Sequence, residues 1–229
     1  MMRSGPFFAL RFIALICALT LGGFSVWLTV AEALTPRLPS FPADATEAQK
    51  FSAARTWTSA AALAGMIRGD LWTNAAIAEA SLYLFESDGA KRAAFPRANI
   101  DTARLIAARA AKLSPHDSRN WLLLAALAEL PGASNVNTVD ALKLSYYTGP
   151  GNLALTPLRL AVATGSPVIA DDELNTFVSL EIQQFIAKLP ALKTMLIPAY
   201  TNANAEGRKA IETALASVDP AFLNTIKRR

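Results

Sequence analysis

The chain has 229 residues, of which 52% are hydrophobic and 17% are charged, so it is too apolar to be intrinsically disordered. Alanine accounts for 45 residues. Because alanine favours helices and disfavours strands, this composition favours an all-α fold. A single cysteine excludes a disulfide framework, and a single histidine excludes a multi-histidine metal site. We therefore expect neither a cofactor nor a metal.

The net charge of +4 comes from the two ends of the chain. Arg3 and Arg11 lie near the N-terminus, and the last three residues are Lys, Arg and Arg. Residues 32–226 hold 17 basic and 18 acidic side chains and are close to neutral. Because no interior run of basic residues offers a stripe for phosphates, nucleic acid is not an expected partner.

Residues 12–31 are the most apolar stretch, with 20 consecutive residues and no charge. As a helix this stretch is about 30 Å long, which matches the hydrocarbon thickness of a bilayer. Arg3 and Arg11 precede it, so the positive-inside rule keeps the N-terminus in the cytoplasm. The sequence therefore predicts a signal-anchor segment, residues 1–33, that crosses the inner membrane once and places the remainder in the periplasm.

A cleaved signal peptide is the alternative interpretation of this segment. Ala31, Glu32 and Ala33 form a small-x-small cleavage site. The apolar stretch is longer than the roughly 7–15 residues of a signal peptide, which favours the uncleaved anchor. Cleavage would instead release a secreted, soluble helical protein. In both cases Cys17 stays behind or within the membrane, and an exported part without thiols suits an oxidising compartment.

Residues 34–43 contain three prolines and are expected to form a semi-rigid linker that lifts the following domain off the membrane. Residues 44–229 then alternate between apolar stretches and helix breakers. Short connectors between such helices imply antiparallel neighbours and stacked helical hairpins. In chain order we expect helices over 44–65, 71–87, 98–113, 118–130, 138–148, 156–165, 171–188 and 205–217, with a short segment at 222–223.

One group of residues has the spacing of a helical-hairpin repeat. Small residues let two helices approach closely, a proline sets the turn, and a tryptophan and a leucine fill the groove of the preceding hairpin. These residues are Ala103, Ala107, Ala110, Pro115, Trp121, Leu124, Ala125 and Ala128. They resemble the tetratricopeptide-repeat family, whose two-helix repeats are about 34 residues long. Alanine replaces the family's aromatic residues at 107 and 128, and a weaker echo at Trp72 departs from the family's spacing.

This resemblance implies a solenoid of stacked hairpins whose concave face binds a segment of another protein. Asn120, Asn152 and Arg159 lie near the starts of predicted helices and are our candidates for that groove. The function expected from the sequence is that of a membrane-anchored, periplasmic scaffold that binds other envelope proteins. The alternatives are an accessory subunit of an envelope enzyme and a purely structural assembly subunit.

A second resemblance concerns residues 141–150 together with residues 158–160. These stretches are similar to membrane-anchored, repeat-like proteins of alphaproteobacteria. That similarity implies a cell-envelope setting and a link to surface polysaccharide assembly.

Candidate catalytic residues are few. His116 and Asp117 are adjacent in a predicted turn, and adjacent residues cannot adopt the geometry of a catalytic triad. Residues 171–173 are Asp, Asp and Glu, but they lack the alternating oxygen ligands of a calcium loop and suit a helix N-terminus instead. The sequence therefore does not point to an enzyme.

Overall fold

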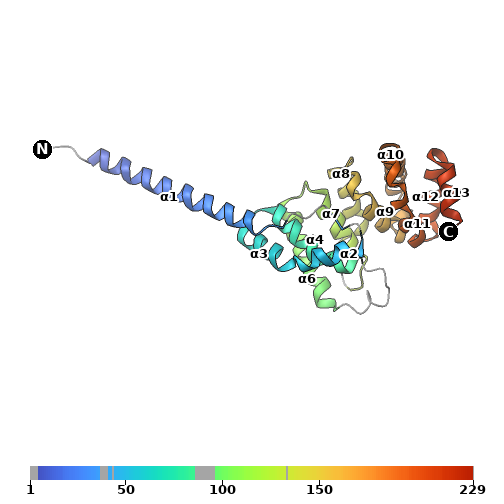
Figure 1. Cartoon of the computed structure of the whole chain (residues 1–229), viewed down its shortest axis with the longest axis horizontal. Helices are drawn as coiled ribbons and strands as arrows, with labels where there is room; N and C mark the ends of the chain where they lie inside the picture. The colour runs from blue at the N-terminus through green and yellow to red at the C-terminus, as the bar shows by residue number, and fades with distance from the viewer. Residues whose placement is uncertain (1–4, 37–40, 43, 86–95, 133, 229) are drawn as a thin grey trace.

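The structure is a computed structural model, and it describes residues 5–36, 41–42, 44–85, 96–132 and 134–228. A long N-terminal helix extends from a helical body, and the two termini lie at opposite ends (Figure 1). All the regular secondary structure of the described residues is helical, which confirms the all-α prediction.

The α-helices are α1 (Gly5–Ala33), α2 (Ala45–Ala53), α3 (Arg55–Gly65), α4 (Gly69–Phe85), α6 (Arg97–Leu113), α7 (Ser118–Ala128), α8 (Thr138–Thr148), α9 (Thr156–Gly165), α10 (Asp172–Lys188), α11 (Leu196–Asn202), α12 (Ala205–Val218) and α13 (Pro220–Lys227). Three short 3₁₀ helices join them: η1 (Leu153–Leu155), η2 (Pro167–Ala170) and η3 (Pro190–Met195).

Several helices begin where the sequence places a side chain that can cap them. Asp44 accepts a hydrogen bond from the backbone N–H of Glu47 at 2.8 Å, as its capping-box spacing predicts. Asn204 and Asp219 cap α12 and α13 in the same way. These side chains satisfy backbone N–H groups that have no partner within the helix.

Two expected boundaries are wrong. The single helix predicted over 44–65 is divided at Ala54, whose N–H is shared between the carbonyls of Lys50 and Phe51 at 3.2 and 3.0 Å. The tightened turn redirects the chain, so that α2 and α3 both pack along α4. Residues 189–204, where no helix is expected, contain α11, and Pro198 lies in the first turn of that helix, where a missing N–H costs no hydrogen bond.

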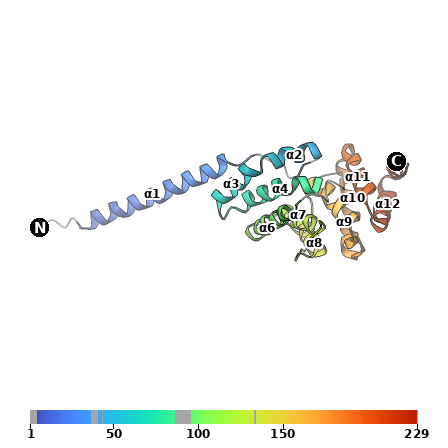
Figure 2. The same ribbon diagram turned by 90° about the horizontal axis from the view of Figure 1, so that it is seen from below.

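Alanine-rich faces bring the central helices close together. Ala103, Ala107 and Ala110 of α6 are fully buried, and α6 packs along α4. The helices then follow one another along the body, with α7 and α8 next to this pair and α9 to α13 at the far end (Figures 1 and 2). One large apolar cluster extends from Phe51 of α2 to Ile226 of α13.

Helix α1 is long and apolar enough to cross a membrane, with a mean hydropathy of 2.1 over residues 8–33. Its C-terminal end packs directly against the helical body. The Trp27 indole donates a hydrogen bond to the carbonyl of Ala64 in α3, and Ala31 is fully buried beside Ala62 and Trp72. Helix α1 therefore contacts the domain directly, and residues 37–40 and 43 of the linker expected over 34–43 lie outside the described residues.

Candidate functional site: a groove between α4, α7, α9 and α11

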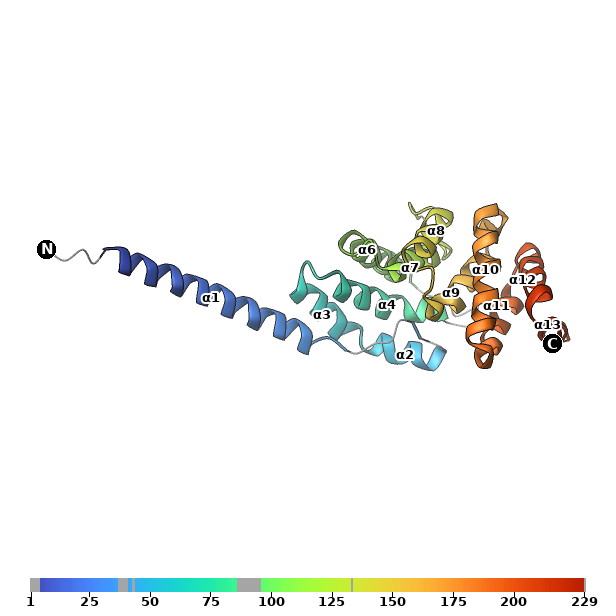
Figure 3. The same ribbon diagram turned by 90° about the horizontal axis from the view of Figure 1, so that it is seen from above.

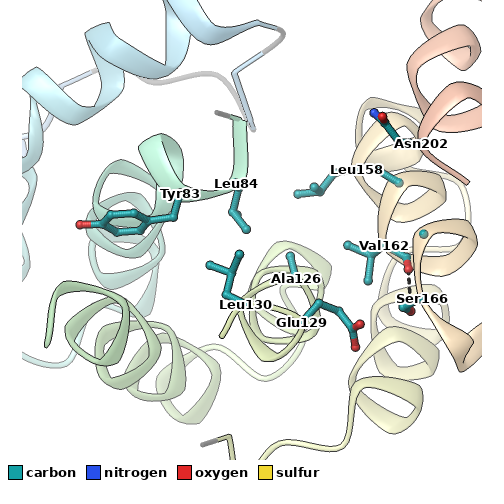
Figure 4. A pocket seen from close by; sticks show the side chains of 11 residues that line it. Tyr83, Leu84, Ala126, Glu129, Leu130, Leu158, Val162, Ser166 and Asn202 are labelled. Carbon is teal, nitrogen blue, oxygen red and sulfur yellow. Dashed lines mark hydrogen bonds between the residues drawn. The ribbon is translucent and has the colours of Figure 1, made fainter. Parts of the chain in front are cut away.

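A groove of about 610 Å³ lies between the two halves of the helical body. Figure 4 shows Leu84, from the end of α4, on one side of the groove and Leu158 and Val162, from α9, on the other. Ala126 of α7 and Leu130, just beyond that helix, form the floor. The groove therefore exists only because helices that are distant in sequence pack together.

The surface of the groove is mixed, with about equal shares of polar and apolar area. Ala161 and Gly165 carry little side chain, which leaves room between α9 and the opposite wall. The Ser166 hydroxyl is already used, because it donates to the carbonyl of Val162 at 2.9 Å. Glu129 remains exposed at the edge and supplies a negative charge. Such a surface suits an amphipathic peptide segment that carries a cationic residue.

Tyr83 belongs to the wall but contributes little polar chemistry. Its ring is 3% exposed, and its hydroxyl points away from the groove (Figure 4). Burial raises the pKa of this hydroxyl above its ordinary value. The phenol therefore stays neutral, and Tyr83 acts as part of the packed wall.

Two of the three residues predicted for a partner groove are in the interior. Asn120 and Arg159 are both 0% exposed, so neither side chain is accessible to another protein, and the prediction is wrong for these two residues. Asn152 is exposed in the turn between α8 and α9, outside the groove described above. The error arises because position near a helix start does not determine which face of the helix is buried.

Asn120 connects three segments of the chain. Its Oδ1 accepts a hydrogen bond from the Thr73 hydroxyl of α4 at 2.8 Å, and its Nδ2 donates to the carbonyl of Ser114 at 3.1 Å. The same hydroxyl lies 3.0 Å from the carbonyl oxygen of Gly69. A buried amide that makes these bonds fixes the position of α7 against α4.

Arg159 holds α8, α9 and α10 together. Its guanidinium forms an ion pair with Glu181 of α10 at 3.2 Å. It also donates to the carbonyls of Ser145 and Gly149, at the end of α8, where backbone oxygens have no partner within the helix. Tyr146 and Thr156 donate to the two oxygens of Glu181 at 2.7 and 3.0 Å.

This buried network is complete within itself. Burial raises the pKa of the Glu181 carboxyl, while Arg159 acts in the opposite direction. Among the described residues, every buried side-chain nitrogen and oxygen atom has a hydrogen-bond partner. The network therefore stabilises the packing of three helices and leaves no group directed at a ligand.

The residues of the repeat pattern lie where close packing requires them. Ala103, Ala110 and Ala125 are 0% exposed and Leu124 is 5% exposed. Trp121 is half-buried, and its indole donates to the carbonyl of Pro115 at 2.7 Å. Trp72 makes the same bond, across the same six-residue separation, to the carbonyl of Met66 at 2.9 Å. The echo between the two tryptophans therefore has a common structural basis.

The remaining candidate residues from the sequence lie in an exposed turn or take part in ion pairs and helix capping. His116 lies in an exposed turn. Lys143 lies 2.9 Å from Asp171 and 2.8 Å from Glu173, and its hydrogen bonds lower the pKa of both carboxyls. Asp171 also caps α10 by accepting from the N–H of Leu174. Within the described residues, no group of three or more His, Cys, Asp and Glu side chains is arranged to hold a metal ion.

Comparisons with protein-family models, with curated proteins and with solved structures find no match to this chain.

Proposed function

We propose that this protein is a membrane-anchored scaffold of the cell envelope, whose helical domain lies in the periplasm and binds a segment of another envelope protein. The groove between α4, α7, α9 and α11 is the observation on which this proposal depends. Its volume and its mixed polar and apolar surface suit a short amphipathic helix or extended segment. Glu129 at the edge favours a segment that also carries Lys or Arg.

The contact between α1 and α3 supports an uncleaved anchor. Cleavage after Ala33 would remove Trp27 and Ala31, and with them the indole hydrogen bond and a fully buried side chain. A signal peptide that is removed makes no lasting contact with the mature domain, so this packing favours retention of α1. The basic residues before α1 favour a cytoplasmic N-terminus, which places the groove on the periplasmic side.

The order of helix contacts supports a tetratricopeptide-like solenoid. Helix α4 packs on α6, α6 packs on α7, and α4 also contacts α7. Helix α7 then packs on α8 and contacts α9. Each hairpin thus meets its neighbour, which is how repeat proteins build an extended binding surface. The resemblance to alphaproteobacterial envelope proteins supports the proposal that the partner is a component of surface polysaccharide assembly.

A photo-crosslinking experiment in cells tests the proposed groove. The photoreactive residue p-benzoylphenylalanine would replace Ala161, which is exposed inside the groove, or Ala187, which is exposed on α10 outside it. We expect a crosslinked envelope protein from position 161 and none from position 187. With the photoreactive residue kept at 161, Gly165→Trp, which fills the groove, should abolish that product while Ala187→Trp leaves it. Equal crosslinking at both positions would contradict a groove-specific partner.

A further inference from the structure

The last turn of α3 and the turn that joins it to α4 together expose three large apolar side chains. Leu63, Met66 and Ile67 are 65%, 61% and 72% exposed, and they follow one another closely in the chain. Met66 follows the last residue of α3 and has a φ of 40°, a positive value that non-glycine residues seldom adopt and that marks the turn there. An exposed apolar group of this kind normally marks a surface that contacts something other than water.

This corner lies alongside α1. Trp27 of α1 bonds to Ala64, whereas Ala31, one turn later, packs near Ala62. Helix α3 therefore runs back along α1 towards the N-terminal end, and the α3–α4 turn is the part of the body that reaches furthest in that direction (Figure 3). Figures 1 and 2 show the same position of α3 at the α1 end of the body.

The polar groups around this corner indicate where the membrane surface lies. Glu32 directly follows the apolar span, and its carboxylate pairs with Arg68 at 3.0 Å, which in turn pairs with Asp70 at 2.6 Å. Trp27 precedes Glu32 by five residues, which is about 7.5 Å along a helix. Because Ala64 accepts the hydrogen bond of the Trp27 indole, the end of α3 lies beside the last turns of the apolar span, while Arg68 in the following turn reaches Glu32 at the end of that span. Tryptophan itself is typical of the membrane–water boundary.

We propose that Leu63, Met66 and Ile67 insert into the periplasmic leaflet of the bilayer as a second membrane contact beside α1. This inference rests on the proposed membrane anchor. A depth of about 5–10 Å is that of apolar side chains at the boundary between headgroups and acyl chains. The charged cluster of Glu32, Arg68 and Asp70 then lies among the lipid headgroups, and the domain is held in one orientation above the membrane.

Depth-dependent quenching in liposomes tests this contact with the full chain. Cys17→Ser removes the only cysteine. Ile67→Cys and, separately, Leu63→Cys introduce a site for an NBD fluorophore at exposed positions, and Leu180→Cys, 48% exposed on α10, is the matched control. The protein is reconstituted in vesicles of phosphatidylethanolamine and phosphatidylglycerol. We expect lipids with a shallow doxyl group to quench NBD at 67 and 63 several-fold more than at 180, and iodide to do the reverse.

Two other outcomes would overturn the inference. Iodide quenching at 67 and 63 equal to that at 180 would show that the turn lies in water. Protection from both quenchers would show that a second copy of the chain covers the turn. Labelling the native Cys17 reports separately on the anchor, because lipids with a deep doxyl group should quench it. Loss of that signal refutes the anchor itself, whereas its presence without quenching at 67 refutes only the second contact.

Discussion

Arg159 is the residue on which the packing of α8, α9 and α10 depends most. It pairs with a buried carboxylate and supplies partners to the last carbonyls of α8. Arg159→Met keeps a similar apolar volume but leaves Glu181 buried without a cation. We expect a loss of about 3–5 kcal/mol in the free energy of unfolding, because an unpaired buried charge is costly. Chemical denaturation in detergent would measure it, with Arg208→Met, at an exposed position, as the control.

The same substitution should change how stability depends on pH. Burial already raises the folded-state pKa of Glu181 above 4.5, and removing Arg159 raises it further. A raised pKa contributes stability that is fully present below the unfolded pKa and is lost as pH rises through the folded pKa. The difference between Arg159→Met and the unmodified chain should therefore be smaller at pH 4.5 than at pH 7. A difference that is independent of pH would contradict this account of Glu181.

Gly207 is required because α12 passes close to the end of α9. A Cβ atom there would lie 2.2 Å from the carbonyl oxygen of Thr164 and 2.7 Å from its Cα, and a backbone cannot move aside cheaply. We expect Gly207→Ala to destabilise the protein by about 1–3 kcal/mol through overpacking. Gly151→Ala is the matched control, since nothing lies within 4 Å of the added atom. Thermal unfolding followed by circular dichroism compares the two.

At the scale of helices, the buried hydrogen bond between Asn120 and Thr73 couples α7 to α4. Asn120→Ala removes the hydrogen bonds of this side chain to Thr73 and Ser114, and we expect a loss of about 1–3 kcal/mol in the free energy of unfolding. Thr73→Val should lower the free energy of unfolding by less in the Asn120→Ala background than in the unmodified chain. A double-mutant cycle of denaturation measurements gives the coupling energy. Strict additivity of the two effects would show that this bond does not couple the helices.

The presence of most helices can be predicted from the sequence, because it depends on local signals. Alanine content, caps such as Asp44 and breakers such as Gly165 indicate most of the helices that the structure contains. The division at Ala54 carries no such signal, since alanine is a strong helix former. It arises because α2 and α3 both pack on α4, which is a tertiary effect.

Which side chains are buried is harder to predict from the sequence than where the helices lie. The alanines of α6 and α7 were correctly expected at packed interfaces, because small residues on one helix face serve close approach. Arg159 and Asn120 are polar, and their burial depends on partners such as Glu181 and Thr73 in other helices. The groove was missed for the same reason: Leu84, Ala126 and Leu158 meet only in the folded molecule. The pattern of a single sequence does not predict such contacts between residues that are distant in the chain.

At the scale of the whole molecule, the contact of α1 with α3 makes a prediction about processing. If α1 is retained, protein extracted from the membrane fraction should still contain residues 12–31. Mass spectrometry of that fraction decides the point. A shorter species in the soluble periplasmic fraction, beginning near residue 34, would instead support the secreted alternative.

The walls of the groove come from opposite ends of the helical domain: Leu84 belongs to α4, and Asn202 ends α11. A chain that is truncated, or cleaved by a protease, before α9 lacks one wall of the groove and cannot bind the partner segment there. Recruitment under the proposed function would consequently be confined to fully synthesised, correctly matured copies. Binding of the partner would then also select for folded, full-length copies of the protein.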